Sequence, residues 1–241
     1  MICNNEKNTE KILDTTEQTR QLYLLHSCPV FTDANSETIG QFREGLFHWV
    51  VQVDPLHNSR YTLDDSGSGR LFSDAYNNIA RYITGQKAWN VYDGTRWIFD
   101  EDGCMVTELC KFLGDVLREY TKQPGLFPET LDGQKQKQAY NRYLSSWFSH
   151  TRRQKIIEDA ASVNCLPLSA FDQDPLLINC QNGTYNLREK RFQKHTSDDR
   201  LTHLANVYYD EAARSERFER FIDEIMCGDK EKAKFLQKVF G

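Results

Sequence analysis

The chain has 241 residues, of which 39% are hydrophobic and 12% aromatic, and its formal net charge at pH 7 is −5. This composition predicts a folded, soluble protein with one large or two small domains. No apolar run approaches the roughly 18 residues of a membrane span, and the charged residues 1–11 do not fit a secretory signal, so we expect a cytoplasmic protein with no membrane partner.

The seven cysteines are odd in number, scattered and never spaced as C-x-x-C. This pattern fits neither a disulfide framework nor a zinc knuckle, so we interpret the cysteines as reduced thiols. His26 and Cys28 form a His-x-Cys pair, but a structural zinc site requires four ligands. We therefore predict no metal site in this chain.

The first third of the chain has few strong patterns. Residues 1–20 are polar and are expected to form a loose leader or a short surface helix. Short apolar groups within residues 21–53 suggest one or two elements, and LDDSGSGR at 63–70 indicates a turn or linker. We predict an N-terminal extension of unknown role at residues 1–60 and an accessory domain at residues 61–241.

The stretch WNVYDGTRW, residues 89–97, places two tryptophans around an Asp-Gly turn and predicts a β-hairpin. Strand side chains alternate between faces, so a three-residue Tyr-Asp-Gly loop would set Trp89 directly across from Trp97. A strand over residues 79–83 is expected to lead into this hairpin. Two interpretations of the rings are open: a core beneath a helix, which we favour, or a platform on which nucleic-acid bases stack.

The clearest helix covers about residues 104–121, where apolar residues recur at three- and four-residue spacing. We expect its apolar stripe to cover both tryptophans of the hairpin. Further helices are predicted around residues 140–148 and from a Thr151 cap onward. Together with a second hairpin, these elements predict an α+β fold, mainly helical with two β-hairpins packed on helices.

The second hairpin is predicted in LLINCQNGTYNL, residues 176–187, with a two-residue Asn-Gly turn. A loop with an even number of residues places Ile178 on the same face as Tyr185. Two short helices are predicted at residues 215–226 and from Asp229 onward, and their apolar residues are expected to face inward.

Residues 133–194 form the only basic segment, with 10 basic and 5 acidic side chains in an otherwise acidic chain. Such a segment can follow a phosphate backbone, although a solvated surface is the ordinary explanation. If the chain binds DNA, we expect the contacts to come from two groups of cations. These are Arg152, Arg153 and Lys155 at a predicted helix start, and Arg188, Lys190, Arg191 and Lys194 near the second hairpin.

A different class of function is suggested by FDQDP, residues 171–175. Asp172 and Asp174 have the Asp-x-Asp spacing that can hold two magnesium ions in a primer-synthesising or nuclease site. Such a pair normally ends an apolar strand, whereas here a proline follows and no third carboxylate is evident. We favour an Asp-Pro turn and predict no catalytic residue, with the metal-dependent enzyme as the alternative.

Several motifs in residues 61–241 resemble the N-terminal domain of the phage and plasmid primase-helicase family, which is shared with the poxvirus primase-helicase. They include the tryptophan pair within residues 89–97, the Asp-Pro turn at 174–175, Asn-Gly-Thr at 182–184 and Gly-Asp at 228–229. The resemblance depends on the order and spacing of these pieces together.

In that family the domain precedes a superfamily 3 helicase that forms a ring on DNA and hydrolyses ATP. This chain has no G-x-x-x-x-G-K-[ST] phosphate loop, so the resemblance implies a non-catalytic accessory domain that positions DNA, assembles the ring, or both. We expect DNA as a partner, self-association into a ring in the full-length protein, and the helicase module after residue 241. We expect no cofactor for this chain, with ATP and Mg²⁺ serving the helicase module.

Overall fold

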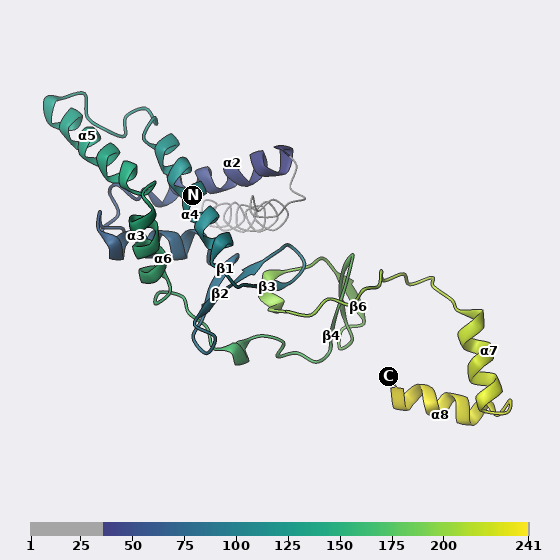
Figure 1. Ribbon diagram of the computed structural model, residues 1–241. Helices are drawn as coiled ribbons and strands as arrows, with labels where there is room; N and C mark the ends of the chain where they lie inside the picture. The colour runs from purple at the N-terminus through teal and green to yellow at the C-terminus, as the bar shows by residue number, and fades with distance from the viewer. Residues whose placement is uncertain (1–35, 241) are drawn as a thin grey trace, which may run out of the picture. The chain divides into compact units, whose positions relative to one another are not determined.

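The computed structural model describes residues 36–240, and the chain divides into two compact units between Val207 and Tyr208. Seven α-helices and two three-stranded antiparallel sheets lie within the described residues (Figure 1). The predicted α+β class, mainly helical with two hairpins, is therefore confirmed. The His26 and Cys28 pair and the expected leader at residues 1–20 lie outside the described residues.

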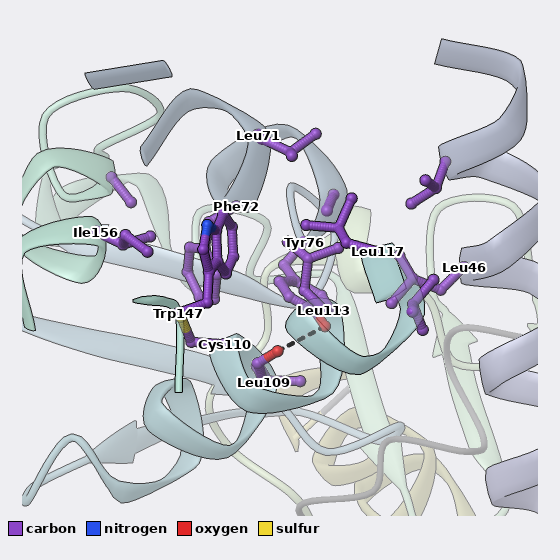
Figure 2. Packing of buried hydrophobic residues seen from close by; sticks show 14 of the residues in the cluster. Leu46, Leu71, Phe72, Tyr76, Leu109, Cys110, Leu113, Leu117, Trp147 and Ile156 are labelled. Atoms are coloured by element: carbon purple, nitrogen blue, oxygen red, sulfur yellow. Dashed lines mark hydrogen bonds between the residues drawn. The ribbon is translucent and has the colours of Figure 1, made fainter. Parts of the chain in front are cut away.

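Five helices surround the core of the first unit. They are α2 Ser36–Val53, α3 Asp65–Ala75, α4 Cys104–Tyr120, α5 Leu131–Ser146 and α6 His150–Ala160. Helix α4 contributes most to this core, as its predicted apolar stripe indicates, and Leu109, Leu113 and Leu117 are fully buried (Figure 2). The Tyr76 hydroxyl at the end of α3 donates a 2.8 Å hydrogen bond to the Leu109 carbonyl, which ties α3 to α4 (Figure 2).

Helix α2 contributes Phe42, Leu46 and Val50 to the same core, and all three are buried. The Phe42 ring packs against the rings of Tyr76 and Phe112, with centroids 6.5 and 5.2 Å away. Helix α2, which lies within the predicted N-terminal extension at residues 1–60, therefore packs with α3 and α4. The boundary between residues 60 and 61 stays a prediction.

The prediction of a turn or linker over residues 63–70 is wrong, because α3 begins within this stretch and is capped by the Asp64 carboxylate. One of the glycines that suggested a linker, Gly69, serves helix packing instead. A Cβ atom on Gly69 would lie 2.7 Å from the Cβ of Asp159 and 2.8 Å from the nitrogen of Ala160 on α6. Glycine at this position therefore lets α3 and α6 approach closely.

The first sheet has the order β1-β2-β3, with strands Ala80–Ile83, Ala88–Tyr92 and Trp97–Asp100. The predicted strands are confirmed, but the prediction that Trp89 and Trp97 lie directly across from each other is wrong. Trp89 pairs with Asp100, and Trp97 pairs with Tyr92. The two indole rings therefore lie on opposite faces of the sheet. Both rings are buried, which is incompatible with a base-stacking platform built from them.

The register differs from the prediction because the loop has an even number of residues. Four residues, Asp93 to Arg96, separate β2 from β3. The Asp93 carboxylate accepts hydrogen bonds from the N–H groups of Thr95 and Arg96 at 2.7 and 2.8 Å. These bonds stabilise the longer loop, and the one added residue reverses the face of every side chain that follows.

Each tryptophan belongs to a different apolar cluster. Trp89 packs edge-on against Phe72, with ring centroids 5.9 Å apart, and joins the helical core. Trp97 packs against Phe171 at 5.6 Å in a second cluster, and its indole N–H donates to the Ser197 carbonyl at 2.9 Å. The prediction that the 104–121 helix covers the tryptophans therefore holds for Trp89 and is wrong for Trp97.

The second sheet has the order β4-β5-β6, with strands Leu177–Cys180, Gly183–Asn186 and Arg191–Gln193. The even loop is confirmed, and Ile178 lies directly opposite Tyr185. The loop consists of Gln181 and Asn182, so the predicted Asn-Gly turn is displaced by one residue. Strand β1 corresponds to the strand predicted over residues 79–83, whereas β6 adds a third strand that was not predicted to the second hairpin.

The second unit contains helices α7 Glu216–Ile225 and α8 Lys230–Phe240, as predicted. The prediction that their apolar residues face inward is wrong. Phe218, Phe221 and Ile225 are 60%, 52% and 48% exposed, because two short helices cannot by themselves enclose both apolar stripes. None of the helices in the described part of the chain combines the length and apolarity that crossing a bilayer requires.

Substitution of Gly69 tests the close approach of α3 and α6, and Gly40 on α2 provides a matched control. We expect Gly69→Ala to lower the free energy of unfolding by about 1–3 kcal/mol, because the added methyl group overpacks the helix contact. At Gly40 the described structure places no neighbour within 4 Å of an added Cβ. Gly40→Ala should therefore raise the free energy of unfolding by about 0.5–1 kcal/mol through helix propensity. Urea denaturation measures both values, and a stabilised Gly69→Ala variant would contradict the close packing.

Candidate nucleic-acid interface

Arg152 lies at the start of α6, where the sequence predicts a phosphate-binding position. Ser149, rather than the predicted Thr151, caps this helix by accepting a hydrogen bond from the Arg152 N–H at 3.3 Å. The Arg152 guanidinium forms an ion pair with Asp65 and donates to the Ser68 hydroxyl at 3.3 Å, both on α3. Its side chain is 21% exposed. These contacts hold α6 against α3.

Arg153 also makes contacts within the protein. Its guanidinium donates to the carbonyls of Phe148 at 2.7 Å and Trp147 at 3.5 Å, directly after the end of α5. A cation at this end of a helix satisfies its last carbonyl groups and interacts favourably with its dipole. Lys155 is exposed. Of the three cations predicted at this helix start, two are therefore engaged in packing.

The second group of predicted cations surrounds the turn between β5 and β6. The Asn186 side-chain oxygen shapes this turn by accepting hydrogen bonds from the N–H groups of Arg188 and Glu189 at 3.0 and 3.1 Å. Lys190 completes the turn with a left-handed φ of 53°. The side chains of Arg188, Lys190, Arg191 and Lys194 are all exposed, and we call these four residues the β5–β6 cations.

Two of the β5–β6 cations pair with acidic residues. Arg188 lies 3.7 Å from Asp174, and Arg191 lies 2.9 Å from Glu189, with the arginine side chains 69% and 65% exposed. Exposed pairs contribute only about 0–1 kcal/mol each. A phosphate group can therefore compete for both guanidinium groups, whereas Arg152 and Arg153 are held by the fold.

Acidic side chains border the β5–β6 cations. Asp199 accepts a 3.2 Å hydrogen bond from the Gln193 amide on β6. Burial raises the pKa of Asp199, and the nearby carboxylates of Asp198 and Asp174 raise the pKa further. A polyanion is therefore favoured at the exposed turn and repelled from these carboxylates.

The carboxylates of Asp172 and Asp174 hold loops. Asp172 has a left-handed φ of 52° and accepts hydrogen bonds from the N–H, at 2.8 Å, and the hydroxyl of Thr202. Asp174 accepts a hydrogen bond from the Leu176 N–H at 3.0 Å, as in an Asp-Pro turn. Within residues 36–240 no group of three or more His, Cys, Asp or Glu side chains is arranged to hold a metal ion. These contacts favour the turn interpretation over the metal site.

A hollow of about 580 Å³ beside β3 brings together residues that the sequence analysis did not combine into one site. Its lining includes Asn90, Arg96, Trp97, Phe99, Leu168 and Phe171. Asn90 is 4% exposed, whereas Phe99 and Leu168 are each 49% exposed. Strand parity is the signal that could have found part of this set, because an even loop places Asn90, Trp97 and Phe99 on one face.

Comparison with known proteins agrees with the resemblance found in the motifs. A family model described as D5 N terminal like matches residues 69–227, which is more than half of the chain. Domains of this family precede the helicase in phage and plasmid primase-helicases. The predicted relationship is therefore confirmed. A search of curated proteins found no match.

Substitution of Arg152 tests whether its charge serves packing. We expect Arg152→Ala to lower the free energy of unfolding by about 1–3 kcal/mol, because it leaves a partly buried Asp65 without its partner. Lys155→Ala, a control on the same helix, should change the free energy of unfolding by less than about 0.5 kcal/mol. Urea denaturation measures both. An Arg152→Ala variant with unchanged stability and weakened DNA binding would show that the guanidinium serves a ligand instead.

Proposed function

Because this chain belongs to the D5 N terminal like family, we propose that it is an accessory domain of a primase-helicase that helps to position DNA for the helicase. The observation that carries the proposal is the group of β5–β6 cations, four exposed positive side chains within residues 188–194. Cations that face solvent attract phosphate groups, and the release of counterions from DNA favours such contacts. The domain contributes binding energy in this proposal, and the helicase supplies the ATP chemistry.

Contacts of this kind determine the character of the binding. Phosphate contacts carry no information about base sequence, so we expect similar affinity for unrelated sequences. Arg188 and Arg191 can bind a phosphate through two parallel hydrogen bonds, whereas Lys190 and Lys194 act as point charges. Because the interaction is electrostatic, it should weaken steeply as the salt concentration rises.

Charge reversal of Lys190 and Lys194 tests the proposal. We expect the Lys190→Glu/Lys194→Glu variant to bind all sequences more weakly and to flatten the slope of log K against log salt by about 0.7–0.9 per lost phosphate contact. Lys135→Glu/Lys137→Glu on the exposed side of α5 is a control with the same change in net charge. Fluorescence anisotropy with labelled single- and double-stranded DNA at several salt concentrations measures the affinity. Equal effects of the two variants, or unchanged binding by the first, would contradict a role for this turn.

The exposed apolar face of α7 supports a second candidate role, self-association into a ring. Phe218, Phe221 and Ile225 recur at three- and four-residue spacing and lie on one side of the helix. Exposed apolar patches of this kind commonly mark contacts between proteins. In an assembled ring, this face would be buried against a neighbouring copy.

Phe221→Glu tests self-association because it places a charge within this apolar face. Arg220→Gln makes the same change in charge on the polar side of α7 and serves as the control. In sedimentation velocity of the full-length protein, we expect Phe221→Glu to shift the population toward the monomer, while Arg220→Gln assembles as the wild type does. Normal assembly of the Phe221→Glu variant would exclude this face from the interface.

A further inference from the structure

We propose that the hollow beside β3 binds an unpaired nucleobase, with the Asn90 amide against the polar edge of the base and the Phe99 ring against its flat side. The proposal deepens the proposed function and rests on it, because it adds a contact with the base to the contacts with the phosphate backbone. The argument uses burial, hydrogen bonding, apolar surface and charge of the residues that line the hollow.

Asn90 provides the first observation. It lies on the central strand β2 and is 4% exposed, and its Oδ1 has no hydrogen-bond partner among the described residues. A side-chain amide offers two donors and an acceptor with two lone pairs. Most buried polar groups in proteins have a partner, so an unpaired oxygen leaves a hydrogen-bonding position for a ligand or a water molecule.

The cross-strand neighbours of Asn90 explain why its amide oxygen lacks a partner. In the strand register, Asn90 lies between Arg81 on β1 and Phe99 on β3. The Arg81 guanidinium donates to the Asn164 carbonyl at 3.2 Å, and Phe99 has no polar side-chain atom. A ligand that enters the hollow beside Phe99 can therefore supply a hydrogen-bonding group that the protein does not.

The apolar lining fits a flat ring. Phe99 and Leu168 are each 49% exposed, whereas Trp97 and Phe171 are buried. An exposed aromatic ring together with an amide is a combination that proteins use to bind bases, by stacking on the ring and hydrogen bonding to the base edge. Asparagine in particular can pair with the N6 and N7 positions of adenine. The volume of about 580 Å³ lies within the usual range for small-molecule sites.

The charges of the lining favour an uncharged ligand over a phosphate. Arg96 and Asp172 both line the hollow, so one cation and one carboxylate offset each other. The Arg96 guanidinium also lies 3.8 Å from the Asp93 carboxylate. A phosphate group would be repelled by these carboxylates. The neutral base of a nucleotide is therefore the part that this hollow suits.

The base can come from a single strand or from a free nucleotide, and the experiment separates the two sources. The first probe is a fluorescent oligodeoxyadenylate, compared with an abasic strand of the same length and charge. The variant is Phe99→Leu, which removes the ring and keeps an apolar side chain. Tyr208→Leu, which removes an exposed ring elsewhere in the chain, is the matched control.

We expect the wild-type chain to prefer the adenine strand over the abasic strand by about fivefold to a hundredfold. Phe99→Leu should remove most of this preference without changing the affinity for the abasic strand, and Tyr208→Leu should retain it. Asn90→Leu, checked for folding by circular dichroism, should reduce the preference for adenine over thymine. Equal affinity of the wild type for the two strands would overturn a site for bases of a strand.

A second arm uses adenosine, which carries no phosphate, and nuclear magnetic resonance of the Phe99 ring and the Asn90 side-chain amide. Shifts in the wild type that are lost in Phe99→Leu support the hollow and identify the free nucleoside as a ligand, even if no strand binds and the proposed function fails. Loss of strand binding on charge reversal at Lys190 and Lys194 concerns the phosphate contacts alone. If the wild type shows no preference for the adenine strand and adenosine causes no shifts at Phe99 and Asn90, the proposal is overturned.

Discussion

The even loop between β2 and β3 is the constraint on which the rest of the first unit depends. Four residues separate the two strands, and the Asp93 carboxylate holds the turn by accepting hydrogen bonds from two backbone N–H groups. Trp89 and Trp97 therefore leave the sheet on opposite sides. One ring completes the helical core, and the other packs against Phe171, which lies 74 residues further along the chain. Other parts of the chain therefore pack against both faces of the sheet, and the Phe99 ring stays exposed.

Hydrogen bonds at the edge of β3 and at the loop before it connect the first sheet to the segment that contains the second sheet. The backbone N–H of Trp97 donates a hydrogen bond to the Leu201 carbonyl at 2.8 Å, along the outer edge of β3. From β4, the Asn179 side-chain amide donates to the carbonyls of Thr95 at 2.9 Å and His203 at 3.0 Å. Asn179 is itself buried, so these bonds are made away from water, where an unpaired amide would be costly. The hollow lies where this covering segment meets the exposed Phe99 ring.

Positive side chains in this chain serve two purposes, and the two groups differ in how deeply they are buried. Arg152 pairs with the Asp65 carboxylate, and Arg153 donates a hydrogen bond to the Phe148 carbonyl directly after α5. Removal of either side chain would leave those groups unpaired. The β5–β6 cations have no such role in packing, because the side chains of the two arginines that pair with acidic residues are 69% and 65% exposed. In the proposed function, the phosphate groups of DNA supply the opposite charge for these solvent-facing cations. In this proposal the domain holds DNA through its surface, while its buried cations maintain the fold.

Local pattern alone was enough to identify α4 and the even loop of the second hairpin, because periodicity and turn chemistry depend on residues close together in the chain. It also indicated the family, which depends on the order of short motifs. Tertiary structure decided the remainder. The glycine-rich stretch before Arg70 resembles a linker in the sequence, and only the structure shows α6 packed against Gly69. The register at Trp97 depends on hydrogen bonds made by a single carboxylate. The hollow joins Asn90 to Thr202, and no local pattern relates two residues that meet only when a distant segment covers the sheet.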